Sequence, residues 1–429
     1  NLKIAQFNSK NNQIKFLKHK GLFVYNYCKE MYHFKDKRND ILVTPNHKML
    51  FREPRHKQFQ ALEAENIKYN RIEFTNSGDY DNEEIKEFIL PAIKHKQNRI
   101  HEKYVHQHED KKIPADLWLE FIGYYVTEGG KETAPTIGIT QKEGENSRKI
   151  EKCLEKLAEY IGFTLTKIKL GPYNKFKITN TQLYKYLTEN CGQLAHQKKL
   201  PIKLTEISKK QLKILFDAMM LGDGSKDGKA FGSTSEQLAD EFQTLSLLLG
   251  KSASKHLAYD EKTRGNRKRF YRIILSNQTT PQIKKSSIKK LNYVGKVWCF
   301  STETGFFITR RNGKIAIQGN TLQAQTSVLA AGNPKLGRFE PFQTIAQQID
   351  LPPSLINRFD VIFVLRDMPD KFRDESIASH VLAQYQKDDK LIPVERDLFR
   401  KYVAHAKQKI KPILTDEAVK EIKDFYVKM

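Results

Sequence analysis

The chain has 429 residues, of which 39% are hydrophobic and 10% aromatic, so it holds enough apolar material for several packed cores and is not a low-complexity disordered protein. No run of about 18 uncharged apolar residues occurs, and we therefore expect no membrane span. The four cysteines are widely scattered, which argues against a zinc site or a disulfide framework and favours a cytoplasmic location. The first residues contain neither an initiator Met nor an apolar signal core, so we expect the chain to begin inside a longer protein.

The formal net charge of +24 lies almost wholly before residue 321. Residues 1–320 contain 57 Lys and Arg against 35 Asp and Glu, whereas residues 321–429 contain 17 against 15. A localised basic excess favours a polyanionic partner, and nucleic acid is the natural candidate. On charge alone, a solvated surface rich in Lys and Glu, as in thermophilic proteins, is the alternative.

The N-terminal region predicts short β-strands, because apolar and polar residues alternate over 22–25 and 41–43. Residues 83–90 are predicted to be helical. The basic, histidine-containing stretch 94–112 is predicted to be a connector.

An internal repeat follows between residues 113 and 276. Each copy has an apolar helix, a strand, a second helix and further alternating stretches. The predicted elements are 117–130, 136–140, 147–161, 164–170 and 175–178 in the first copy, and 212–224, 230–233, 235–249 and 270–275 in the second. Two similar halves predict a pseudo-twofold α/β domain.

Strand-like alternation returns over 297–300 and 306–309, with turn signals at Thr304-Gly305 and Asn312-Gly313. The β-domain is therefore predicted to resume there. From Thr321 the pattern changes to a separate α/β segment. Its predicted helices are 372–386, 394–407 and 416–428.

Each apolar helix of the repeat ends in one acid followed by glycine, Glu128 in the first copy and Asp223 in the second. Two such helices can pack closely and bring the carboxylates together, where they repel unless a cation lies between them. This pattern predicts a Mg²⁺ site for phosphodiester hydrolysis. The alternative is that each segment is a buried helix ending in an acidic turn.

Segments 121–129 (FIGYYVTEG) and 216–224 (FDAMMLGDG) resemble the two LAGLIDADG motifs of the DOD-type homing endonucleases carried by inteins, and 198–201 (KKLP) resembles the basic block between them. The resemblance implies saddle-like sheets over a long double-stranded DNA site. It also implies Mg²⁺ coordination by Glu128 and Asp223. Lys199 is a candidate base or charge stabiliser, or simply a surface lysine. Many such endonucleases keep the fold after losing activity, so an inert insert is the alternative.

Basic residues on the expected strands and loops would mostly hold phosphates, while a few read bases. They are Lys167, Lys169, Lys175, Lys177, Arg264, Arg267, Lys268, Arg269 and Arg272.

The segment 44–47 (TPNH) follows an expected strand, and Gly319-Asn320-Thr321 closes the resumed β-domain. This order resembles an intein whose Hint splicing domain is split by an endonuclease. The resemblance implies that the Asn320 amide attacks its own backbone carbonyl and cuts the chain before Thr321, whose hydroxyl accepts an acyl group. His47, oriented by Thr44, would destabilise and protonate the upstream scissile amide.

Three features depart from the usual intein pattern. Gly319 stands where many inteins have His, and no His lies near Gly305. Cys299 stands where many carry Asp, and we treat it as a candidate assistant or, equally, as a buried inert thiol. The upstream Cys or Ser nucleophile is not in the chain, so we expect this fragment not to complete splicing.

Residues 327–339 and 349–364 resemble the minichromosome maintenance (MCM) helicases. The resemblance implies part of an AAA+ ATPase, with Asn333 positioning the attacking water and Arg358 as an arginine finger that reaches a neighbour's ATP in a hexameric ring. From the residues alone, Asn333-Pro334 is a turn and Arg358 an ion-pair partner. The GxxxxGK[ST] loop is not in the chain, so we expect no ATP hydrolysis from it alone.

The sequence thus predicts a multidomain protein. The expected parts are an all-β Hint domain N-part (1–105), an α/β LAGLIDADG endonuclease domain (106–284), a Hint C-part (285–320) and a partial α/β AAA+ segment of an archaeal-type MCM helicase with C-terminal helices (321–429). The predicted functions are protein splicing and cleavage of double-stranded DNA at the intein-less host gene. A chain that acts mainly as a fragment of an ATP-dependent helicase is a further alternative.

Overall fold

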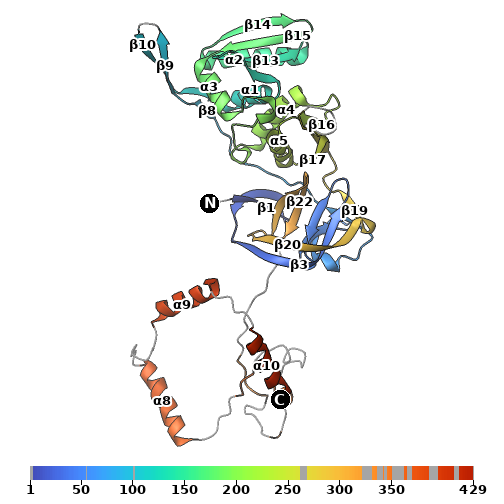
Figure 1. Ribbon diagram of the computed structural model, residues 1–429, viewed down its shortest axis with the longest axis vertical. Helices are drawn as coiled ribbons and strands as arrows, with labels where there is room; N and C mark the ends of the chain where they lie inside the picture. Colours follow the sequence, from blue (N-terminus) through green and yellow to red (C-terminus); the bar gives the residue numbers. More distant parts are fainter. Residues whose placement is uncertain are drawn as a thin grey trace. The chain divides into compact units, whose positions relative to one another are not determined.

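The structure is a computed structural model that describes most of residues 3–320 and part of the chain beyond them. The described ranges are 3–54, 56–99, 102–260, 268–320, 331–335, 342, 345–349, 362–364, 370–385, 395–409 and 415–428. The chain divides into two compact units, Asn1–Ala324 and Gln325–Met429. Figure 1 shows the elements of both units.

A β-domain in the first unit is formed by both ends of residues 3–320 (Figure 1). One sheet has the strand order β19-β7-β5-β22-β21-β1-β2, with β6 paired to β5, and the other has the order β20-β3-β4. The strands of the N-terminal part are β1 (Lys3–Asn8), β2 (Gln13–Lys18), β3 (Gly21–Lys35), β4 (Asp40–Val43), β5 (Lys48–Arg52), β6 (Gln60–Glu63) and β7 (Arg71–Phe74). The strands of the returning part are β19 (Gln282–Lys284), β20 (Ile288–Ser301), β21 (Phe306–Arg311) and β22 (Lys314–Gly319).

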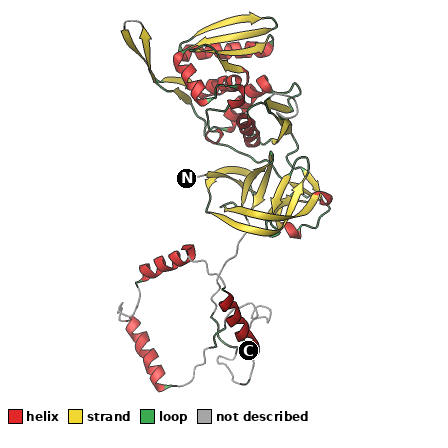
Figure 2. Ribbon diagram, in the orientation of Figure 1, coloured by secondary structure: helices red, strands yellow, loops and turns green. Residues whose placement is uncertain are grey.

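An α/β domain of two similar halves lies between these parts of the chain (Figure 2). The first half contains α1 (Ala115–Glu128), β12 (Gly129–Lys131), β13 (Thr136–Lys142), α2 (Glu145–Ile161), β14 (Thr164–Leu170), β15 (Tyr173–Thr179) and α3 (Thr181–Asn190). The second contains α4 (Lys209–Asp223), β16 (Ala230–Ser233), α5 (Glu236–Leu248), β17 (Ser252–Tyr259) and β18 (Phe270–Ser276). Their sheets have the orders β12-β13-β15-β14 and β16-β18-β17, so both copies of the predicted repeat are confirmed.

Helices α1 and α4 pack against each other through glycine. A Cβ placed on Gly123 would lie 2.4 Å from the Cβ of Ala218, and one placed on Gly222 would lie 2.2 Å from Thr127 Oγ1. Gly123 and Ala218 occupy equivalent positions of the two copies, and so do Thr127 and Gly222. In each of these two contacts, one of the two residues is a glycine without a side chain. The missing side chains let the two helices approach closely and set where their C-terminal ends lie.

The predicted helix over 83–90 is wrong, because residues Glu87–Leu90 form strand β8, which pairs with β11 (Lys111–Pro114). The residues alternate in burial: Leu90 is buried and Phe88 stacks on Trp118 with ring centroids 4.2 Å apart, whereas Ile89 is exposed. The true period is therefore two, and pairing with a strand twenty residues away overrides the helical composition.

The predicted connector over 94–112 is also wrong. It contains the antiparallel hairpin of β9 (Ile93–Arg99) and β10 (Glu102–His108). The predicted boundary between 105 and 106 falls inside β10, whereas the chain leaves the β-domain after β7 and returns to it at β19.

The second unit contains α6 (Ile345–Gln348), α8 (Lys371–Tyr385), α9 (Arg396–Lys409) and α10 (Asp416–Lys428), and the last three confirm the predicted helices. Apolar side chains on these helices are exposed, among them Phe372, Leu398 and Phe425. In the part of the chain that the structure describes, no helix combines the length and apolarity that a bilayer crossing requires.

The glycine-mediated helix contact predicts the effect of a small substitution. Gly123→Ala adds a methyl group where Ala218 leaves no room, and we expect it to lower the free energy of unfolding by about 1–3 kcal/mol. The double variant Gly123→Ala/Ala218→Gly moves the single methyl group to the other helix and should recover most of that loss. Urea unfolding of the three proteins measures this, and equal loss in the single and double variants would refute the packing argument.

Candidate functional site

The two predicted carboxylates lie at the C-terminal ends of the packed helices, Glu128 as the last residue of α1 and Asp223 as the last residue of α4. Asp223 reaches the surface, yet surrounding protein atoms desolvate its carboxyl group and raise its pKa to about 7, and the charge of Glu128 adds to the rise. Burial also raises the pKa of Glu128, opposed by a hydrogen bond that Gln141 Nε2 donates to its Oε1 at 3.2 Å. The helix packing thus brings together two acids, and the charge of Glu128 disfavours the ionised form of Asp223.

The donor chemistry of this pair suits a hard divalent cation, because two carboxylates provide negative oxygen ligands and a cation would relieve their repulsion. Among the described residues, no group of three or more His, Cys, Asp or Glu side chains is placed to hold a metal. A Mg²⁺ ion held by Glu128 and Asp223 would therefore complete its coordination with water and phosphate oxygens, as this ion usually does.

The buried lysine of the basic block is Lys198, and sequence reasoning selected its neighbour Lys199. Lys198 is 5% exposed, and its Nζ donates to Tyr125 O at 3.3 Å and lies 3.8 Å from the Tyr125 ring centroid. Burial lowers its pKa to about 8. Residues 198–200 form an irregular loop, and no local pattern in the sequence distinguishes Lys198 from Lys199 as the residue that faces Tyr125.

The predicted phosphate-binding lysines on β14 and β15 form ion pairs with acids of their own domain. Lys167 pairs with Glu151 at 2.8 Å and Lys169 with Glu143 at 3.1 Å. Glu132 accepts from both Lys175 and Lys177. DNA phosphates would have to displace these carboxylates, so the pairs reduce the net attraction.

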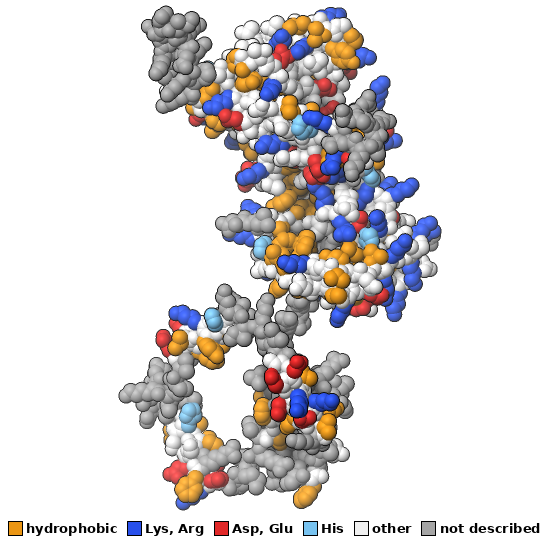
Figure 3. Space-filling model, viewed as in Figure 1, with side chains coloured by type: hydrophobic (Ala, Val, Ile, Leu, Met, Phe, Trp, Pro, Cys, Tyr) orange, Lys and Arg blue, Asp and Glu red, His pale blue; other side chains and the backbone are white. Residues whose placement is uncertain are grey.

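The second half carries its basic residues differently. Arg269 pairs with Asp260 at 3.3 Å, Lys268 Nζ lies 2.6 Å from His196 Nδ1, and Arg272 is exposed on β18. The predicted Arg264 and Arg267 lie outside the described residues. On the face shown in Figure 3, Lys and Arg side chains are spread over the first unit and are not confined to the α/β domain.

The predicted splicing residues lie in the β-domain. The backbone N–H of His47 donates to the backbone oxygen of Thr44 at 3.0 Å, and Thr44 Oγ1 donates to Asn46 Oδ1 at 2.8 Å. His47 is buried, and burial lowers its pKa to about 4, while a hydrogen bond with Gln318 of β22 opposes the shift. The imidazole is therefore neutral in the folded protein near pH 7. Gln318 was not predicted, because its contact is made across the sheet.

Asn320 follows β22 directly, and its backbone N–H and both ends of its side-chain amide form hydrogen bonds. Its N–H donates to Gly305 O at 2.9 Å. In the orientation that satisfies both ends of its amide, the side-chain nitrogen donates to Phe300 O at 3.0 Å and to Thr302 Oγ1 at 2.9 Å, and the oxygen accepts from the Thr302 N–H at 3.1 Å. Thr302 is the partner that the sequence did not reveal. The predicted Thr321 lies outside the described residues.

Two departures from the usual intein pattern have structural counterparts. A Cβ on Gly319 would lie 2.6 Å from Lys48 O, so the close approach of β22 to β5 leaves no room there for a histidine. Cys299 is buried on β20 beside Phe300, with its Sγ 3.6 Å from Phe300 O. The thiol is thus next to the carbonyl that holds the Asn320 amide.

Of the two residues predicted for ATP chemistry, Asn333 is exposed in the second unit, and Arg358 lies outside the described residues.

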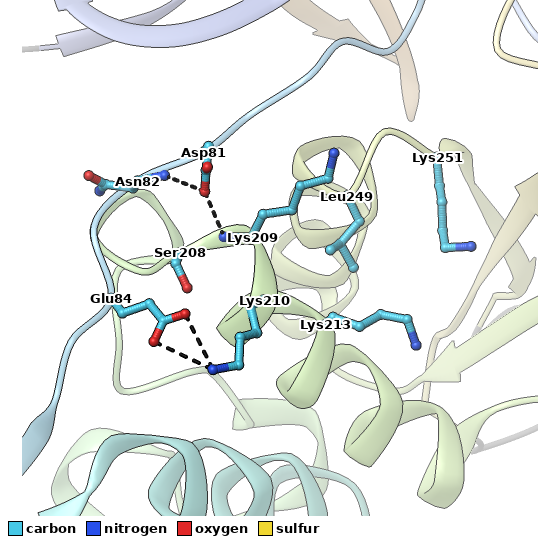
Figure 4. A pocket seen from close by; sticks show the side chains of 9 residues that line it. All are labelled: Asp81, Asn82, Glu84, Ser208, Lys209, Lys210, Lys213, Leu249 and Lys251. Carbon is cyan, nitrogen blue, oxygen red and sulfur yellow. Dashed lines mark hydrogen bonds and ion pairs between the residues drawn. The ribbon is translucent and has the colours of Figure 1, made fainter.

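A pocket of about 730 Å³ opens at the start of α4, at the opposite end of the helix from Asp223 (Figure 4). Three of its four lysines make ion pairs, Lys209 with Asp79 at 3.0 Å, Lys210 with Glu84 at 3.3 Å, and Lys213 with Asp217. Because most of its cations are compensated, the pocket is a weaker candidate for a functional site than the carboxylate pair.

Comparison with known proteins identifies relatives of the C-terminal part. The family model of the MCM P-loop domain matches residues 312–385. The minichromosome maintenance protein MCM of Saccharolobus solfataricus is 38% identical over 108 residues, which are 25% of this chain and 16% of that protein. The DNA replication licensing factor mcm4 of Schizosaccharomyces pombe is 33% identical over 114 residues, or 25% of this chain and 12% of that protein. The chain thus spans less than a fifth of the length of these relatives.

Solved structures similar to the chain include I-DmoI in complex with DNA and Ca, at 14% identity and a TM-score of 0.30, covering 38% of this chain and 84% of that one. The N-terminal LAGLIDADG domain of DUF199/WhiA is also similar, at 8% identity and a TM-score of 0.25, covering 37% of this chain and 75% of that one.

The buried His47 predicts a pH dependence of stability. Its pKa of about 4 in the folded protein lies below the ordinary value of 6.5, so between these values the unfolded chain binds a proton that the folded chain does not. Stability should therefore fall as the pH is lowered from about 6.5 to about 4. We expect His47→Gln to reduce this slope by about 1 kcal/mol per pH unit in urea unfolding. An unchanged slope would contradict a buried neutral imidazole.

Proposed function

We propose that this chain, whose C-terminal part is a segment homologous to MCM helicases, is an intein in an MCM-type host and carries a LAGLIDADG-type DNA endonuclease as its inserted domain. The observation that carries the proposal is the placement of Glu128 and Asp223 at the C-terminal ends of helices α1 and α4. These helices pack closely because each contributes one glycine to their contact. The β-domain built from both ends of residues 3–320 supports it, because an insertion into a splicing domain produces that chain order.

The α/β domain would bind double-stranded DNA along its two sheets and cut both strands. Glu128 and Asp223 would hold Mg²⁺, which when bound lowers the pKa of water and stabilises charge on the attacked phosphate. Gln141 donates to Glu128 and orients that carboxylate. The basic side chains of β14 and β15, and Arg269 just before β18, would exchange their acidic partners for phosphates. Arg272 on β18 would bind phosphate directly, and Lys199 stays a candidate for charge stabilisation.

The β-domain would carry out the splicing chemistry as a Hint-type domain. The side-chain nitrogen of Asn320 attacks the Asn320 backbone carbonyl carbon and closes a succinimide ring. The bond to the nitrogen of residue 321 breaks, and that nitrogen leaves as an amine after taking up a proton. Phe300 O and Thr302 Oγ1 accept from the attacking nitrogen and hold it in place. His47, neutral near pH 7, would serve the upstream amide, and Thr321 would accept the acyl group.

The strand pairing suggests revised boundaries for these domains. We place the splicing domain at residues 3–80 and 277–320 and the endonuclease domain at residues 85–276, because β19 pairs with β7 while β8 pairs with β11. The segment from Thr321 would be part of the host's ATPase. Asn333 and Arg358 would act in ATP hydrolysis within the complete ring.

The endonuclease assignment predicts the outcome of an isosteric substitution. With Mg²⁺ and a plasmid that carries the uninterrupted helicase-gene junction, the parent chain should make a single cut. Asp223→Asn removes a ligand charge and should lower cleavage by at least about a hundredfold, because even residues that only orient metal ligands contribute up to that much. Asp217→Asn, on the exposed side of the same helix, is the matched control and should cut normally. Gel-shift binding without any cut by the parent would indicate an inert insert.

The splicing assignment predicts release of the C-terminal segment. The parent chain should slowly yield a fragment ending in a succinimide at residue 320, seen by mass spectrometry of the intact mixture. Asn320→Ala removes the nucleophile and should abolish release, whereas Asn292→Ala, exposed on β20, should not. Continued release from the Asn320 variant would contradict cyclisation.

A further inference from the structure

We infer that the inserted α/β domain positions the C-terminal splice strand, and that Gln243 of α5 is the positioning residue. This inference rests on the splicing function proposed above. The geometry points to the turn between β21 and β22, residues 311–314, which lies against α5 and β17 of the α/β domain (Figure 1).

Gln243 joins the two domains through one amide. Its side chain is fully buried, and Nε2 donates to Ala253 O and to Gly313 O, each at 2.8 Å. The Lys255 N–H donates to the same Gly313 carbonyl at 2.9 Å. One backbone oxygen of the splicing domain therefore accepts two hydrogen bonds from the α/β domain. Leaving such a buried acceptor without its donors is costly.

The close approach of the turn to β17 requires glycine at position 313. Its φ is +73°, and a Cβ at this position would lie 2.2 Å from Lys255 O. The turn thus fits against β17 because residue 313 is glycine, for both conformational and steric reasons.

Charged groups hold the same turn from its flanks. Arg310 donates to Asp240 O at 3.0 Å and to Thr244 Oγ1 at 2.8 Å, and its guanidinium pairs with the Asp240 carboxylate at 2.7 Å. Lys314 Nζ lies 2.9 Å from His256 Nε2. These contacts join both ends of the turn to α5 and β17.

Strand β22 connects the anchored turn to the splicing residues. Ile315 and Ile317 belong to a hydrophobic cluster that joins the core of the α/β domain to Phe7, Ile14 and Leu50 of the β-domain, and Ala316 belongs to a second cluster within the β-domain. Further along the same strand, Gln318 bonds His47, and Asn320 follows. A shift of the turn would therefore move the strand that sets the Asn320 amide and the His47 partner. Misplacement of reacting groups by about 1 Å can cost about a hundredfold in rate.

The test compares two buried glutamines of the α/β domain in the full chain. Gln243→Ala removes the contact with the turn. Gln182→Ala is the matched control, because Gln182 is equally buried and its Nε2 donates to the carbonyls of Leu90, Pro91 and Glu109, none of which belongs to the β-domain. We expect Gln243→Ala to slow release of the C-terminal segment about tenfold and Gln182→Ala to leave it within about twofold of the parent.

Hydrogen exchange of the β22 amides gives a second readout that does not depend on release. Exchange over 314–319 should rise about tenfold in Gln243→Ala and stay unchanged in Gln182→Ala. Equal effects of the two substitutions would overturn the inference, since they would reflect general loss of stability. If the folded parent releases nothing, the splicing function fails, while exchange that rises only in Gln243→Ala still supports the positioning of β22.

Gly313→Ala serves if Gln243→Ala does not fold. Its control is Gly228→Ala, which has a similar φ of +67° but no neighbouring atom within 4 Å of an added Cβ. Faster exchange of β22 in the Gly313 variant alone supports the inference, and equal exchange in both variants overturns it.

Discussion

The arrangement of the α/β domain depends on how closely α1 and α4 approach. Side chains normally keep helix axes well apart. Here Gly123 faces Ala218 and Gly222 faces Thr127, so one residue of each contacting pair has no side chain. The same approach places Glu128 and Asp223 at neighbouring helix ends, where burial raises the pKa of both carboxyl groups and the charge of Glu128 adds to the rise at Asp223. The packing of the two helices and the electrostatics of the two acids are therefore linked. The sheets of the two halves then extend from this helix pair as similar units.

Much of this arrangement could be predicted from local pattern. The repeat was recognisable because each apolar helix ends in an acid and a glycine and is followed by a strand and a further helix, and period and length suffice for such elements. The turns at Gly305 and Gly313 were identified from residue type, and both glycines adopt positive φ. The last three helices were likewise evident from apolar spacing.

What could not be predicted depends on distant contacts. Residues 87–90 form a strand because β11 pairs with them, although their composition suits a helix. The choice between Lys198 and Lys199 depends on which side of a short loop faces Tyr125. Gln318 and Thr302 become visible only when β22 is placed beside His47 and the end of β20. A single sequence contains no local signal for such pairings.

Strand β22 is buried on both faces. Ile315 and Ile317 belong to a hydrophobic cluster that extends from the α/β domain into the β-domain, and Ala316 belongs to a second cluster within the β-domain. An inserted domain is usually regarded as separable from its host, since the chain can be cut at the two connections and rejoined. Here such a deletion would remove part of the hydrophobic cluster that contains Ile315 and Ile317 and leave the Gly313 carbonyl without its two donors. A protein that lost the α/β domain would therefore need compensating substitutions in the remaining β-domain. The contacts of β22 and its preceding turn with the α/β domain therefore favour retention of that domain.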